Sequence, residues 1–151
     1  MKSESVNLHR VERPSLLTVY RTVNTDPVTA LLLIGWVLAM ISLPIMKWIW
    51  GSAMIPLGLT LGVLLQVTAV FLILNHRWGW QKTAGTAVLI ATFTLFVEWL
   101  GSTTGFPFGS YHYTDLMQPQ IGGVPVLIPA AWFMMLPCAW AVADQIQAQL
   151  P

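Results

Sequence analysis

The side chain best suited to acid–base chemistry in this sequence is a glutamate within an apolar segment. Glu98 is the sole ionisable residue inside the four long apolar runs of the chain. A charge at the centre of a membrane helix costs about 2.5–3.5 kcal/mol on insertion scales, and such groups usually serve function. Glu98 lies about three residues from the end of its run, where this cost is smaller. We interpret it as a buried proton donor; the alternative is a structural carboxyl that bonds a neighbouring helix or loop.

A second set of candidate residues lies in the 22-residue segment 102–123 that follows. A connection of this length without structure of its own is usually functional or disordered, and its aromatic content argues against disorder. We expect a folded lid or re-entrant segment that packs near Glu98. The alternative is a rigid cap whose aromatic rings anchor in the headgroups. Its candidate side chains are Phe106, Phe108, Tyr111, His112, Tyr113 and Asp115.

Two further patterns concern the helices that would hold these residues. Pro129 and Pro137 flank Trp132, which predicts either a bend that opens a pocket beside the indole or a simple packing kink. Gly58 and Gly62 form a GxxxG pattern that favours close helix packing. No HxxxH or HExxH pair is present, so we expect neither a metal site nor a bound cofactor.

The composition identifies the environment in which these residues must work. Of 151 residues, 56% are hydrophobic and only 9% are charged, against about a quarter in soluble domains. The mean hydropathy is +0.67. These values exclude a soluble globule, a disordered chain and a nucleic-acid binder, and the single cysteine excludes a disulfide framework. An integral membrane protein remains.

Four runs are long enough to cross about 30 Å of hydrocarbon. They predict an all-α, polytopic membrane helix bundle with spans at about 28–46, 54–74, 84–101 and 124–143. We expect a polar leader over 1–27 and one transmembrane domain over 28–151. Six of the seven Lys and Arg residues precede the first span or lie between the second and third, which predicts that both termini are cytoplasmic.

The stretch from Glu98 to Met134 resembles a prokaryotic family of membrane carotenoid biosynthesis proteins. Characterised members are carotenoid hydratases that act on γ-carotene, lycopene or, in an archaeal branch, a bacterioruberin precursor. Members are typically longer, with further spans after the last one here, so the resemblance implies an N-terminal part, a truncated gene product or a short paralogue. The matching elements are Glu98 with Gly101, then Gly105-Phe106-Pro107-Phe108-Gly109 with Tyr111 and Tyr113, then Gly123-Val124-Pro125 with Ile128-Pro129 and Trp132.

The resemblance implies a membrane hydro-lyase that adds water to the terminal C=C of a ψ end group, without a cofactor. Glu98 would be the general acid, and Asp115 or His112 would activate the water. The cation would be stabilised by the aromatic residues Phe106, Phe108, Tyr111, Tyr113 and Trp132. The glycines and prolines of the motifs would shape the loop: Gly101, Gly105, Pro107, Gly109, Pro125 and Pro129.

Two rival functions stay open at this point. A lycopene cyclase also begins by protonating a terminal alkene but then closes a ring. A non-catalytic subunit would only bind carotenoid or transfer it to another protein. In each case we expect a lipid-soluble carotenoid and membrane lipids as partners, other carotenoid enzymes or a second copy as further candidates, and a prokaryotic inner or plasma membrane as the location.

Overall fold

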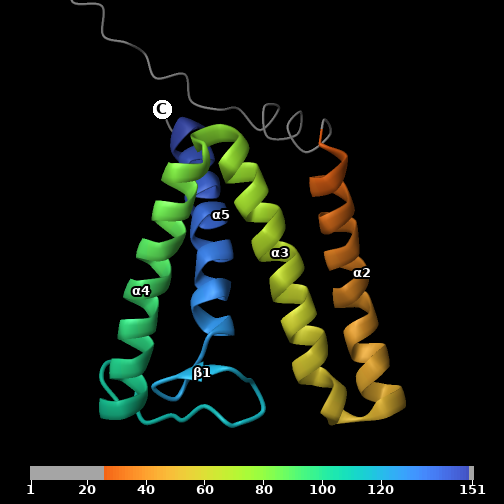
Figure 1. Cartoon of the computed structure of the whole chain (residues 1–151), viewed down its shortest axis with the longest axis vertical. Coiled ribbons are helices and arrows are strands. Elements are labelled where there is room, and N and C mark those ends of the chain that lie inside the picture. The colour runs from red at the N-terminus through yellow and green to blue at the C-terminus, as the bar shows by residue number, and fades with distance from the viewer. Residues whose placement is uncertain (1–25, 150–151) are drawn as a thin grey trace, which may run out of the picture.

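A computed structural model describes residues 26–149 as a bundle of four long helices that run alternately up and down (Figure 1). Each helix is long and apolar enough to cross a membrane, so the expected all-α polytopic bundle is confirmed. Most of the predicted leader lies outside the described residues. In chain order the elements are α2 (Pro27–Trp50), η1 (Ser52–Met54), α3 (Ile55–Trp78), α4 (Trp80–Thr104), β1 (Gln120–Ile121), β2 (Val124–Pro125) and α5 (Leu127–Gln149).

The helices extend beyond the predicted spans wherever polar residues continue the helical hydrogen bonding. Thus α4 ends at Thr104 rather than near 101, and α5 continues to Gln149 rather than to 143. At the other end, α2 begins as the sequence indicates, because the Asp26 carboxylate accepts a hydrogen bond from Val28 N at 3.1 Å and Pro27 occupies the first turn.

The predicted start of the last span is wrong by three residues. Val124 and Pro125 form the strand β2, which pairs antiparallel with β1, so α5 starts only at Leu127. The turn between the strands has positive φ at both central residues, +60° at Gly122 and +82° at Gly123. Such a turn joins two antiparallel strands directly. Val124 and Pro125 therefore belong to a hairpin and not to the first turn of the helix.

Packing divides the bundle into two parts that share α3. The α2–α3 interface is close: Gly58 lies under Leu43, and Gly62 lies under the methyl end of Met40. On its other face α3 meets α4 and α5 through a core of Val70, Leu74 and Phe133. The remaining helix surface is apolar and exposed, as expected of helices that face lipid rather than water.

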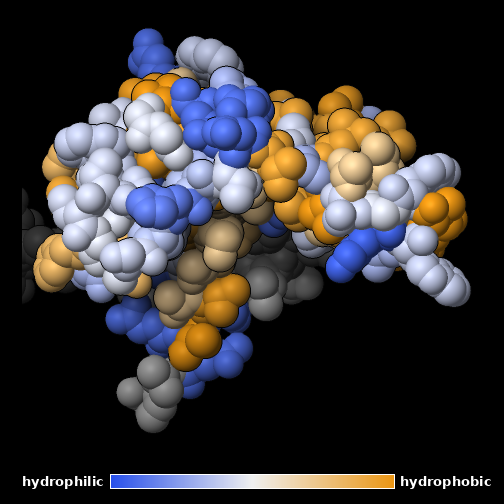
Figure 2. All heavy atoms as spheres, turned by 90° about the horizontal axis from the view of Figure 1, so that it is seen from below, coloured by the Kyte–Doolittle hydropathy of each residue, from blue (hydrophilic) through white to orange (hydrophobic). Residues whose placement is uncertain are grey.

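The two ends of the bundle differ in what they carry. The beginning of α2, the α3–α4 turn and the end of α5 lie at one end, and the long segment 105–126 lies at the other (Figure 1). Viewed from the loop end, pale and blue side chains gather over the loop, and orange ones lie on the helix flanks (Figure 2). This arrangement separates a polar cap from an apolar belt. The direction in which the bundle crosses the membrane stays a prediction from the positive charges.

The α2–α3 contact yields a stability prediction. A side chain at Gly58 would place its Cβ 2.9 Å from Leu43 Cδ1, so Gly58→Val should lower the free energy of unfolding by about 1–3 kcal/mol. Denaturant titration of the purified protein in detergent micelles measures this. The matched control is Gly85→Val, because a Cβ at Gly85 meets nothing within 4 Å. Equal unfolding midpoints for the two variants would contradict the packing.

Candidate functional site

The site is built on the inward face of α4. Ala87, Ala91, Thr94 and Glu98 follow one another at helical spacing. Ala87 packs on the apolar core of α3 and α5, and Thr94 is buried with its hydroxyl donating to Ile90 O at 2.8 Å. Glu98 therefore projects from the face of α4 that the bundle covers. Since α4 continues to Thr104, Glu98 lies six residues before the end of the helix, where the sequence predicted about three.

Three neutral side chains donate hydrogen bonds to the Glu98 carboxyl. The Tyr113 hydroxyl lies 2.7 Å and the Tyr111 hydroxyl 2.9 Å from Oε2, and Trp132 Nε1 lies 3.2 Å from Oε1. The tyrosines come from the loop and Trp132 from α5, so one carboxyl joins three segments. An ionised carboxylate accepts bonds at about four lone-pair sites, and three are occupied here.

No cation neutralises this carboxyl within residues 26–149. The one charge pair there is at the opposite end of the bundle, where His76 Nδ1 lies 3.9 Å from Asp26 Oδ2. Glu98 is thus satisfied by dipoles alone, so no cation among these residues compensates its negative charge once it has given up its proton. An uncompensated carboxylate can attract a positive charge that develops on a bound molecule.

Small residues allow the loop to approach α4. A Cβ at Gly101 would lie 2.6 Å from the Tyr111 hydroxyl and 3.2 Å from Phe108 Cδ2, so the loop rests on bare helix backbone at this point. Gly105 ends α4 in the left-handed region at φ +75°, and its N–H bonds Gly101 O at 2.9 Å. The chain can therefore reverse at once and return over Glu98.

The two tyrosines remain protonated at this site. Their rings meet edge to face, with centroids 5.6 Å apart. Burial, followed by the hydrogen bond to Glu98, raises the pKa of Tyr113 well above its ordinary value, and the same two causes raise the pKa of Tyr111. Both phenols therefore act as hydrogen-bond donors and not as anions at neutral pH.

The other predicted site residues lie around this centre rather than in contact with it. Phe106 and Phe108 are exposed at 72% and 63%, and both lie on the loop beyond the end of α4. His112 and Asp115 are exposed, and neither is among the side chains that bond the Glu98 carboxyl. Of the structural residues, Pro125 and Pro129 are buried, Pro107 follows a cis peptide bond, and Gly109 N–H bonds Gly105 O at 2.6 Å. Residues 26–149 contain no group of three potential metal ligands.

Two hollows among residues 26–149 bear on the site, and one of them adjoins it. A polar pocket of about 450 Å³ opens at the loop end and includes Tyr113 in its wall. The sequence predicted His112, Tyr113 and Asp115 as site residues, but it did not indicate the other residues that line this pocket. The hydroxyl and amide residues give no signal in the sequence, because such types are common in loops. The lining residues are Ser102, Thr103, His112, Tyr113, Asp115, Gln120, Gly122 and Gly123.

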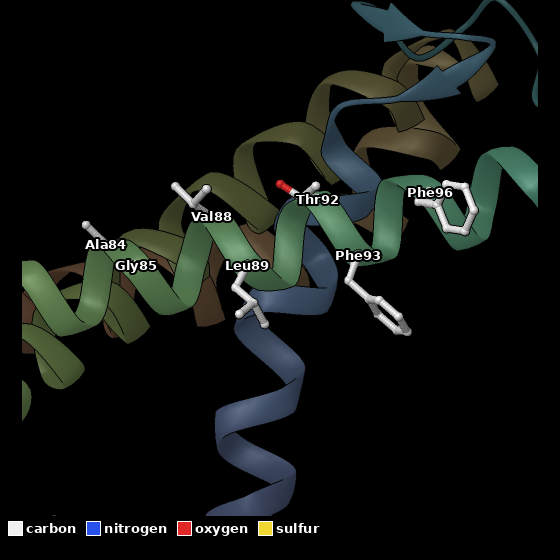
Figure 3. Close-up of a pocket in the computed structure, with 7 residues that line it drawn as sticks. All are labelled: Ala84, Gly85, Val88, Leu89, Thr92, Phe93 and Phe96. Carbon is white, nitrogen blue, oxygen red and sulfur yellow. The ribbon is translucent and has the colours of Figure 1, made fainter.

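The second hollow is an apolar groove of about 810 Å³ whose residues all come from α4, between Ala84 and Phe96 (Figure 3). In this view α5 and α3 pass behind α4, so the groove lies on the outer surface. At about 3.6 residues per turn, Glu98 lies roughly 130° around the helix from the centre of the groove. The groove is therefore part of the lipid-facing surface and does not lead to the carboxyl.

The close approach at Gly101 predicts the effect of one methyl group. Gly101→Ala should push the Tyr111 hydroxyl away from Glu98 and lower the free energy of unfolding by about 1–3 kcal/mol. Thermal unfolding in detergent micelles, followed by circular dichroism, measures the change. Gly85→Ala is the control, because its methyl group would meet open space. A Gly101→Ala variant as stable as the control would show that the loop does not rest on this glycine.

Comparison with known proteins supports the family that the motifs suggested. A family profile described as carotenoid biosynthesis protein matches residues 58–150, which are 93 of the 151 residues. No curated protein and no solved structure matches the chain. The matched region contains nearly all of α3 and the whole of α4, the loop and α5, hence every residue that bonds Glu98. This chain belongs to the carotenoid biosynthesis protein family.

Proposed function

We propose that this protein is a membrane hydratase of carotenoid biosynthesis. It would add water across the terminal trisubstituted C=C of a ψ end group, as in γ-carotene or lycopene, and form a tertiary alcohol. The observation that supports this most is the Glu98 carboxyl, which three neutral donors and, within residues 26–149, no cation hold at one end of an apolar bundle. The reaction is redox-neutral, so it needs no electron-transferring cofactor.

The first step is transfer of a proton from the Glu98 carboxyl to the less substituted alkene carbon. The C=C π electrons form the new C–H bond, and the other carbon becomes a tertiary cation. The carboxylate left behind accepts the bonds from Tyr111, Tyr113 and Trp132, which stabilise it and so favour the transfer. General acids of this kind contribute about 10²–10⁴-fold to a rate.

The cation then needs electron-rich surroundings that exclude competing nucleophiles. The Glu98 carboxylate supplies the nearest negative charge, and the faces of Tyr111, Tyr113 and Trp132 would each add about 0.5–2 kcal/mol. Trp132 is 40% exposed on α5, so an end group dissolved in the bilayer could reach the site from its side. Phe106 and Phe108 are proposed to contact the polyene as it enters.

In the last step a water oxygen forms the C–O bond and loses a proton. His112 and Asp115 are proposed to accept this proton, since both line the polar pocket beside Tyr113. We place the protein in the inner or plasma membrane of a prokaryote with both termini cytoplasmic, following the distribution of positive charge. The partners proposed are the carotenoid and membrane lipids, with other pathway enzymes or a second copy as further candidates.

The decisive experiment replaces Glu98, the proposed general acid, with glutamine. Glu98→Gln should lower the hydration rate about 10²–10⁴-fold, because the amide keeps the size of the side chain but cannot supply the proton. The protein is expressed in cells that accumulate the unhydrated carotenoid, and the pigments are separated by chromatography and weighed by mass spectrometry. Asp144→Asn is the matched control, since Asp144 is an exposed carboxyl near the end of α5.

The same assay separates the rival functions. Hydration adds one water to the pigment mass, cyclisation leaves the mass unchanged, and a carrier leaves the pigment unaltered. If Glu98→Gln reaches normal membrane levels and still forms the alcohol at the wild-type rate, Glu98 is not the acid. If the wild-type protein forms a cyclic product of unchanged mass, the hydratase assignment is wrong.

A further inference from the structure

The polar pocket at the loop end has a wall in common with the Glu98 site. Tyr113 lines this pocket, and its hydroxyl is also the closest donor to the Glu98 carboxyl, at 2.7 Å. Tyr113 is therefore the one lining residue of the pocket that bonds Glu98. The apolar groove on the outer face of α4 has no such connection.

The composition of the pocket suits water. It holds about 450 Å³, and a water molecule occupies about 30 Å³ of the liquid and needs two to four polar partners. The hydroxyls of Ser102 and Thr103 donate to Trp99 O at 3.1 Å and 2.7 Å, which leaves their oxygens free to accept. Gln120 donates through Nε2 to Thr114 O and Met117 O.

The ionisable residues of the pocket complete this set. His112 and Asp115 are both exposed, and within residues 26–149 neither side chain has a hydrogen-bond partner in the protein. In solution such groups bind water. The pocket thus carries acceptors from α4, an amide from β1 and two ionisable side chains from the loop, at one end of helices whose flanks are apolar.

We infer that this pocket binds the water consumed by the reaction, and that Tyr113 links the bound water to Glu98. The inference rests on the proposed hydratase function, which requires one water for each product molecule. Lipid surrounds the helices and supplies none. The loop pocket provides a polar route that ends against the ring of Tyr113.

The link through Tyr113 also returns a proton to Glu98 after the reaction. After Glu98 has given its proton to the alkene, the water oxygen bonds the cation and must release one proton. The base that accepts this proton, His112 or Asp115, can pass it to the Tyr113 hydroxyl oxygen as Tyr113 passes its own O–H proton to Glu98 Oε2, which regenerates the carboxyl. The raised pKa of Tyr113 requires that the two transfers occur together, since a free phenolate is disfavoured. Charge and atoms balance: one alkene and one water give one alcohol.

Two variants test this, and they affect different parts of the route. Thr103→Phe places a ring inside the pocket, whereas Tyr113→Phe keeps the ring of the wall and removes the linking hydroxyl. The matched control is Leu116→Phe, because Leu116 lies on the same loop, is 72% exposed and does not line the pocket. All three are prepared as full chains in lipid nanodiscs.

The first measurement does not depend on catalysis. Hydroxyl-radical footprinting oxidises side chains beside bound water, so Tyr113 should be labelled in the wild-type protein and about tenfold less in Thr103→Phe, with Leu116→Phe unchanged. Buried Phe133, which is 3% exposed, gives the background level. Labelling of Tyr113 at the Phe133 level in the wild type would overturn the inference, whether or not the protein is a hydratase.

The second measurement follows the carotenoid in D₂O. Thr103→Phe and Tyr113→Phe should each lower formation of the alcohol about tenfold or more. The Thr103→Phe variant is equilibrated in D₂O before the carotenoid is added, so deuterium on the Glu98 carboxyl should still enter the recovered alkene, because protonation is reversible and a cation that is not captured loses a proton. Wild-type rates of alcohol formation in both variants would overturn the inference while leaving the hydratase function intact. Absence of alcohol from the wild type would instead overturn the proposed function.

Discussion

The structure depends on how one carboxyl is satisfied within an apolar bundle. Glu98 lies inside a helix that can cross a membrane, where an unpaired polar group is costly. Three side chains donate hydrogen bonds to the Glu98 carboxyl, two from the loop and one from α5. The same bonds fix the loop against α4 and fix α5 beside it. The bonds that satisfy the Glu98 carboxyl therefore also determine how the loop end is arranged.

Small residues make this arrangement sterically feasible. Gly101 leaves space for the Tyr111 hydroxyl, and Gly105 turns the chain back toward the helix that it has just left. Gly122 lies against Trp99, where a Cβ would come within 2.9 Å of the indole. At Gly101 and Gly122 the loop and α4 approach more closely than a side chain would permit. Gly105, Gly109 and Gly123 instead have positive φ, a conformation that glycine adopts without strain.

The loop end separates two environments that an alkene hydration needs. On one side Trp132 and the helix flanks are apolar and open toward lipid, which suits a polyene end group. On the other side the polar pocket suits water. Glu98 and Tyr113 lie between them. In the proposed reaction this geometry would admit the hydrocarbon and the water from different directions, so that water would meet the cation only where the protein directs it.

The sequence by itself determined the membrane class and the four helices, and it singled out Glu98 as a candidate, because hydropathy and a lone ionisable group are local properties of the chain. It also identified the aromatic loop as a folded segment. Only the tertiary structure decided which aromatics meet the carboxyl: Tyr111, Tyr113 and Trp132 bond it, whereas Phe106 and Phe108 do not. The tertiary structure also has a hairpin at the position where the sequence predicted the start of α5. These features depend on backbone dihedrals and on contacts between segments up to 34 residues apart, which no local pattern specifies.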